Sequence, residues 1–87
     1  MAADRSTPAE VLDLRGLKCP LPALLTRRAL SRARAGEELA VLSDDPLAAV
    51  DLPYMCHEEG HDVLAVEWFQ STIRLVLRRR DADSAGR

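Results

Sequence analysis

A cysteine in an unusual local setting is the first feature of the sequence that could carry chemistry. Cys19 lies in the segment LDLRGLKCPLP, residues 12–22, directly before Pro20 and close to Pro22. A residue that precedes proline is driven toward extended backbone angles, which an N-cap needs, and proline itself is favoured at the first helical position. The pattern therefore predicts that Cys19 caps the start of a helix, with its sulfur at the positive end of the helix dipole.

Positive charge is also expected close to this cysteine, because Arg15 and Lys18 lie just upstream. Helix N-termini and nearby cations lower the pKa of a free thiol from about 8.5 to as little as ~3.5–7.5. The sequence thus predicts an exposed, nucleophilic thiolate at Cys19, with the N–H of Leu21 free to point at it. The competing interpretation is a small buried cysteine, since free cysteines are often buried. The residues expected to shape the site are Pro20, Pro22, Arg15, Lys18 and Leu21.

The neighbours of Cys19 restrict the kind of thiol chemistry. No histidine is near it in the sequence to act as a base, and CPLP is not the CxxC pair of a redox protein. A cysteine protease or a disulfide oxidoreductase is therefore poorly supported. A thiolate without such helpers suits a group carrier, which takes a sulfur atom as a persulfide and hands it to another protein. Such a chain acts as a component of a relay rather than as a free-standing enzyme.

A second cluster of candidate ligands lies near the middle of the chain, where Cys56, His57 and His61 could be taken for a metal site. Three ligands without a fourth argue against it. A packed cysteine beside two surface histidines is the better interpretation, so neither a metal nor a cofactor is expected. A disulfide between Cys19 and Cys56 would need the second helix to pass close to the CPLP turn, which the sequence does not show.

Charged residues elsewhere have both ordinary and functional interpretations. Asp45 before Pro46 is typical of a helix N-cap, and together with Asp44 it forms an acidic loop that could also dock a partner. A basic face is predicted on the first helix. It is either a solvated surface or a patch for an acidic partner or RNA, and it comprises Arg27, Arg28, Arg32 and Arg34.

The elements that must position these residues follow from the apolar pattern. Strands are expected at 10–16, 37–43, 63–68 and 73–78, and helices at 20–36 and 44–60, the second kinked or restarted at Pro53. This order predicts an α/β (α+β) two-layer sandwich, βαβαββ, in which two helices cover one face of a four-stranded mixed sheet.

The first of these helices has a predicted buried stripe of Leu25, Ala29 and Ala33, with Thr26 and Leu30 beside it. Leu21 and Leu24 fall outside that stripe, beside the cysteine. Their exposure has two interpretations, partial cover by a neighbouring loop or a spot where a partner docks.

The composition predicts a single soluble domain. Of its 87 residues, 47% are hydrophobic and 30% charged, and the net charge of −2 argues against binding to nucleic acid or an anionic membrane. No apolar run approaches the ~20 residues of a membrane span, and the N-terminus lacks the apolar region of a secretory signal. A cytoplasmic monomer with reduced thiols is expected. Residues 1–9 and 80–87 are predicted to be disordered, which leaves one domain at 10–79.

The sequence resembles the TusA/SirA family of small bacterial sulfur carriers over residues 11–79. The resemblance rests on DLRGLKCPLP with its CPxP motif, on GE after the first helix, on DDP, on the position of Cys56 and on HDVLAVE. It implies the βαβαββ fold and makes Cys19 the persulfide-bearing residue. Some members of the family carry an acidic residue where this chain has Leu21, a departure that bears on the choice of partner rather than on the chemistry.

The same resemblance implies the partners. The sulfur donor would be a cysteine desulfurase or a rhodanese, and the acceptor a DsrE-like protein or a component of tRNA thiolation, molybdenum-cofactor assembly or sulfur oxidation. The alternative function is a non-catalytic regulatory or RNA-binding module, an analogy of fold with the C-terminal domain of bacterial translation initiation factor three. The acidic charge and the scarcity of aromatic residues, 3% of the chain, argue against stable RNA binding.

Overall fold

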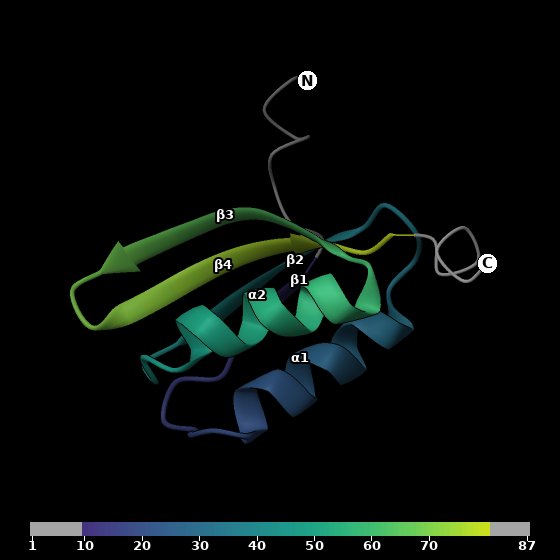
Figure 1. Ribbon diagram of the computed structural model, residues 1–87. Coiled ribbons are helices and arrows are strands. Elements are labelled where there is room, and N and C mark those ends of the chain that lie inside the picture. The colour runs from purple at the N-terminus through teal and green to yellow at the C-terminus, as the bar shows by residue number, and fades with distance from the viewer. Residues whose placement is uncertain (1–9, 81–87) are drawn as a thin grey trace, which may run out of the picture.

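The computed structural model describes residues 10–80 of the chain. Its element order is βαβαββ, as the sequence predicts (Figure 1). The predicted disorder of 1–9 and of 81–87 falls outside the described residues. Arg80, which the sequence predicts to be part of the disordered tail, is among the described residues, and its backbone N–H donates to Nδ1 of His61 at 3.2 Å.

The four strands form one mixed sheet in the order β1-β2-β4-β3. The parallel pair is β1 with β2, and β4 runs antiparallel to both of its neighbours. Because β1 and β2 are parallel neighbours, the loops that follow them leave the sheet at the same edge. The strands are β1 (Glu10–Asp13), β2 (Glu38–Ser43), β3 (Asp62–Phe69) and β4 (Thr72–Arg78).

Two helices, α1 (Leu21–Arg32) and α2 (Ala48–Glu59), cover one face of this sheet (Figure 1). The buried residues of α1 are Pro22, Thr26 and Leu30, with Leu25 and Ala29 packed at the margin. The predicted stripe is therefore correct only in part, because Thr26 and Leu30 form its centre and Ala33 lies past the last residue of the helix. Burial of each large aliphatic side chain stabilises the fold by about 1.5–3 kcal/mol. The other fully buried leucine and isoleucine side chains are Leu52, Ile73, Leu75 and Leu77.

Two predicted helix boundaries are wrong. The first helix ends at Arg32 rather than near Gly36, whose φ of 88° instead serves a turn into β2. Glycine suits that turn because it adopts positive φ without a steric penalty. The N–H of Gly36 donates to the carbonyl of Arg79 at 2.7 Å. The second helix begins at Ala48 and continues through Pro53 without a fresh start. Over the described residues, none of the helices is both long and apolar enough to span a membrane.

Candidate functional site

The loop that carries Cys19 joins β1 to α1 at the edge of the sheet where β2 also ends. Leu14 anchors its start, since this side chain is buried and its N–H donates to the carbonyl of Leu42 at 2.8 Å. Gly16, with a φ of 91°, then turns the chain outward. Figure 1 shows this loop beside the one that precedes α2. Cys19 itself is exposed, as predicted.

Cys19 does not cap the helix, contrary to the sequence-based expectation. The N-cap of α1 is Pro20, and Pro22 occupies the second helical position, so the thiol lies one residue outside the helix start. The N–H of Leu21, expected to be free for the sulfur, is donated to the carbonyl of Lys18 at 2.9 Å. The turn closed by that bond takes up the donor that was expected to point at the sulfur.

Carboxylates from the loop after β2 and from the start of α2 contact the cysteine loop instead. The backbone N–H of Cys19 donates to Oδ2 of Asp45 at 2.7 Å, and its Sγ donates to Oδ2 of Asp51 at 3.4 Å. Asp44 accepts from the N–H of Gly16 at 3.0 Å. The acidic loop after β2 and the first turns of α2 therefore hold the cysteine loop from one side.

Asp45 braces two loops at once. One of its oxygens accepts from Cys19, and the other accepts from the N–H of Leu47 at 3.0 Å. These two backbone hydrogen bonds hold the pKa of its carboxyl below the ordinary value, with a smaller contribution from the charge of Lys18. The predicted N-cap role is wrong in position, since Leu47 is the N-cap of α2. Asp44 and Asp45 both lie beside the CPLP loop, through their hydrogen bonds to Gly16 and Cys19.

The cations near the site do not compensate for these carboxylates. Arg15 is engaged by Asp13 through two contacts, Nε to Oδ1 at 2.9 Å and a terminal nitrogen to Oδ2 at 2.7 Å. Hydrogen bonding from Arg15 lowers the pKa of Asp13 to about 2, so this pair is charge-neutral at pH 7. Lys18 remains as the nearest cation without an ion pair among residues 10–80.

The pKa of the Cys19 thiol is raised rather than lowered. The main cause is its hydrogen bond to Asp51, followed by desolvation and by the negative charges of Asp51 and Asp45. The expectation of a resting thiolate is therefore wrong, because the closest charges are carboxylates and the expected cation Arg15 is paired elsewhere. Nothing in the local sequence around Cys19 indicated Asp51, which lies 32 positions away. The available signal was that the loops after two parallel strands meet at one edge of the sheet.

An apolar rim borders the cysteine on the helix side. Leu21 and Leu24 are 44% and 50% exposed, so each leaves a large part of its apolar surface open to solvent. The outer surface of α2 also leaves Leu47, Val50 and Tyr54 exposed. Large apolar side chains left in water next to a reactive atom are typical of a surface that a partner covers.

The second cysteine takes no part in this site. Cys56 is fully buried in the core, and burial raises the pKa of its thiol to about 11. It is free, as is Cys19. Within residues 10–80, no group of three or more histidine, cysteine or acidic side chains is arranged to hold a metal ion.

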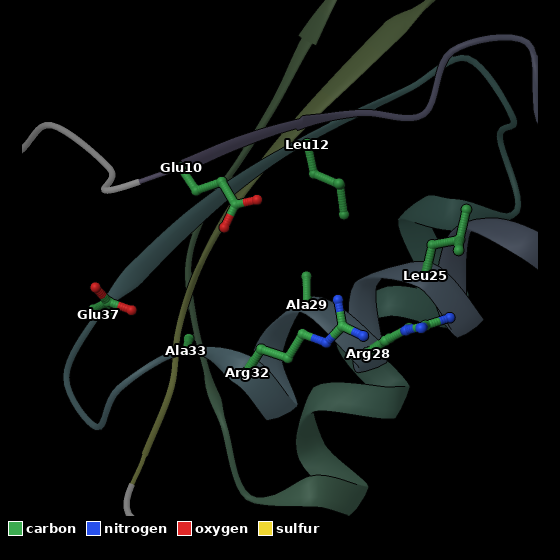
Figure 2. A pocket seen from close by; sticks show the side chains of 8 residues that line it. All are labelled: Glu10, Leu12, Leu25, Arg28, Ala29, Arg32, Ala33 and Glu37. Atoms are coloured by element: carbon green, nitrogen blue, oxygen red, sulfur yellow. The ribbon is translucent and has the colours of Figure 1, made fainter.

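The basic side chains of α1 divide between two surroundings. Arg27 contacts Glu59 of α2 at 3.5 Å, whereas Arg28 and Arg32 border a shallow pocket between α1 and β1. Figure 2 shows Leu12 of β1 pointing into that pocket above Arg32. Cys19 does not line this pocket, so the predicted basic face and the cysteine loop are separate features of the surface.

Comparisons with known proteins agree with this architecture. The family model described as sulfurtransferase TusA matches residues 10–79, and the chain therefore belongs to that family. Its fold is similar to the crystal structure of a SirA-like protein from Desulfitobacterium hafniense, with a TM-score of 0.72 and 23% sequence identity. That match covers 83% of this chain and 99% of the other. Membership indicates a sulfur-carrier or sulfurtransferase role that involves sulfur donors and acceptors.

Proposed function

We propose that this protein accepts a sulfane sulfur as a persulfide on Cys19 and relays it to a partner protein. The observation that supports the proposal is the exposed thiol of Cys19 in the CPLP loop of a member of the TusA family. The alternative thiol, Cys56, is fully buried and cannot meet a partner without unfolding.

The transfer can be written without an external oxidant. The sulfur of Cys19 attacks the outer sulfur of a donor persulfide, R–S–SH, through its thiolate form. A new S–S bond forms on Cys19 while the donor's S–S bond breaks, and the proton lost by Cys19 ends on the released donor thiol. The net change is Cys19–SH plus R–S–SH to Cys19–S–SH plus R–SH. Delivery to the acceptor repeats the same exchange in the forward direction.

The surrounding residues position the sulfur for this exchange. Pro20 and Pro22 set the start of α1, and Asp45 fixes the backbone of Cys19 from the opposite loop. Leu21 and Leu24 supply an apolar rim that a partner can cover briefly.

The partners are proposed by class. A cysteine desulfurase or a rhodanese-type protein would load Cys19, and a DsrE-like protein or a component of tRNA thiolation would take the sulfur. The chain would act in the cytoplasm as a monomeric relay component, without a cofactor and without stable binding to nucleic acid.

The test is an intact-mass measurement after incubation with a cysteine desulfurase and cysteine. The wild-type chain should gain about 32 Da, the mass of one sulfur, and should lose it on reduction. The gain should be absent in Cys19→Ser and retained in Cys56→Ser, which is the matched control. Retention of the adduct in Cys19→Ser would overturn the proposal and favour the regulatory-module alternative.

A further inference from the structure

The thiol of Cys19 is surrounded by an excess of negative charge. Asp51 of α2 receives its hydrogen bond at 3.4 Å, and Asp45 binds its backbone N–H at 2.7 Å. Asp44 lies in the same loop and holds Gly16. A thiolate formed here would face the Asp51 carboxylate within contact distance, where like charges disfavour the ionised form.

The cations of the same loop do not balance this field. Arg15 is held by Asp13, and the charge of Lys18 is felt by the Asp45 carboxyl. Of the two cations in residues 14–20, only Lys18 forms no ion pair with a described carboxylate. In the free chain Lys18 is thus the one unpaired positive group among the described residues of this loop, and it faces three carboxylates, those of Asp44, Asp45 and Asp51.

We propose that Asp51 holds Cys19 as a neutral thiol in the free chain, and that sulfur transfer begins only when a partner sets a cationic side chain against this carboxylate. The second half of this inference rests on the proposed function, whereas the first half concerns the thiol alone. The raised pKa of Cys19 has the Asp51 hydrogen bond as its largest cause, which agrees with the geometry.

Pairing Asp51 with a cation reverses the local balance. The Asp51 carboxylate then accepts hydrogen bonds from the partner's guanidinium or ammonium group instead of from the Cys19 thiol. The thiolate of Cys19 in turn gains a positive charge nearby, which stabilises it. The Cys19 proton leaves to the solvent or to the donor thiol released in the exchange, so that no proton is unaccounted for. Between encounters, the neutral thiol resists alkylation and oxidation, since both require the thiolate. The partner surface that fits this site is therefore basic at its centre and apolar where it meets Leu21 and Leu24.

The test compares Asp51→Asn with wild type in the alkylation of Cys19 by iodoacetamide across pH, read by peptide mass. Asparagine keeps the size of the side chain but removes its charge. The midpoint of the pH profile should move to lower pH, and alkylation near neutral pH should become several-fold faster. Glu58→Gln is the matched control, because it removes one exposed charge from the same helix without any described contact to the cysteine loop. An Asp51→Asn midpoint equal to or above that of wild type would overturn the proposal.

Two measurements on the wild-type chain keep the proposal falsifiable if the variant is poorly folded. Raising the salt concentration from about 0.01 M to about 1 M shortens the Debye length from about 30 Å to about 3 Å. Alkylation by the uncharged reagent should then become faster. A short arginine peptide at low salt should have the same effect. Failure of both would contradict the proposal.

These outcomes are separate from those of the sulfur-loading test. A chain that gains one sulfur on Cys19 but alkylates independently of Asp51 would keep the proposed function and lose this inference. A chain whose alkylation depends on Asp51 but that never accepts sulfur would keep the first half of this inference, the neutral thiol held by Asp51, and would lose both the proposed function and the second half.

Discussion

The two cysteines illustrate how strongly position decides the chemistry of one residue type. Cys19 is exposed on a loop held by carboxylates, and Cys56 is enclosed by the apolar layer between α2 and the sheet. The pKa of both thiols is raised, that of Cys19 mainly by its hydrogen bond to Asp51 and that of Cys56 mainly by burial. Exposure separates the two residues, because only Cys19 can be reached by a reagent or a partner in the folded chain.

At neutral pH, Cys19 should alkylate faster than Cys56 by about tenfold or more. The physical reason is that the reagent reaches Cys19 directly, while Cys56 must wait for local opening and has a pKa of about 11. Peptide-level mass spectrometry after a timed iodoacetamide pulse measures the ratio. The rates should converge in concentrated urea, and equal rates in the folded chain would contradict the assignment.

At the scale of elements, the site depends on two loops from parallel strands. The CPLP loop follows β1, the acidic loop follows β2, and Asp45 joins them through backbone hydrogen bonds to Cys19 and Leu47. The position and the protonation state of Cys19 thus depend on the acidic loop and on α2, both of which are distant from it in the sequence.

Lowering the pH should weaken the hydrogen bonds that the carboxylates of Asp13 and Asp45 accept in and around the CPLP loop. The folded-state pKa values of Asp13 and Asp45 lie below the ordinary 3.8. The stabilisation from these groups is therefore fully present above their unfolded pKa and is lost as the pH falls through the folded values. The free energy of unfolding measured in urea should fall as the pH drops from about 5 toward about 2. The fall should be smaller in Asp45→Asn, and an equal fall in that variant would contradict a bracing role for this carboxylate.

Replacing Pro20 should weaken sulfur loading more than stability. Pro20 is exposed and caps α1 without contacting the core cluster, so Pro20→Ala should keep its circular dichroism spectrum and nearly its urea midpoint. The rate at which the chain gains about 32 Da from a desulfurase should decrease, because the thiol is less firmly placed. A wholly unfolded variant would show that the motif is structural.

On the scale of the whole molecule, one end of the sandwich gathers the features that a partner would recognise. The exposed thiol, the acidic loop and the apolar rim of Leu21 and Leu24 lie together where both helices begin. The shallow pocket lined by Arg28 and Arg32 lies between β1 and α1 and does not include the thiol. A carrier that meets its donor and its acceptor in turn would present one surface to both.

Leu24→Gln should slow sulfur loading by a protein donor while leaving the alkylation rate of Cys19 nearly unchanged. The reason is that Leu24 is exposed and contributes to contact rather than to the chemistry of the thiol, and glutamine adds no charge beside it. Val11→Gln on β1 is the matched control, since Val11 is also exposed and does not belong to the apolar rim. An equal effect of both substitutions on loading would contradict a docking role for the rim.

The fold was largely predictable from the sequence, whereas the electrostatics of the site were not. Strand and helix periodicity predicted all six elements and the two layers. The expected end of the first helix at Gly36 and start of the second helix at residue 44 are wrong because turns closed by backbone hydrogen bonds compete with helix at both places. The exposure of Cys19 followed from its local pattern. Its protonation state did not, because Asp51 reaches it only through the tertiary packing of α2 beside the loop.

Following a labelled sulfur atom into the chain tests the carrier role of Cys19 most directly. A cysteine desulfurase supplied with cysteine that carries a heavy sulfur isotope should load the wild-type protein, and proteolysis followed by tandem mass spectrometry should locate the label. One reducible labelled sulfur is expected on the peptide that contains Cys19 and none on the peptide that contains Cys56. Label on Cys56, or no label on either cysteine while the desulfurase is itself persulfidated, would contradict a carrier role for Cys19.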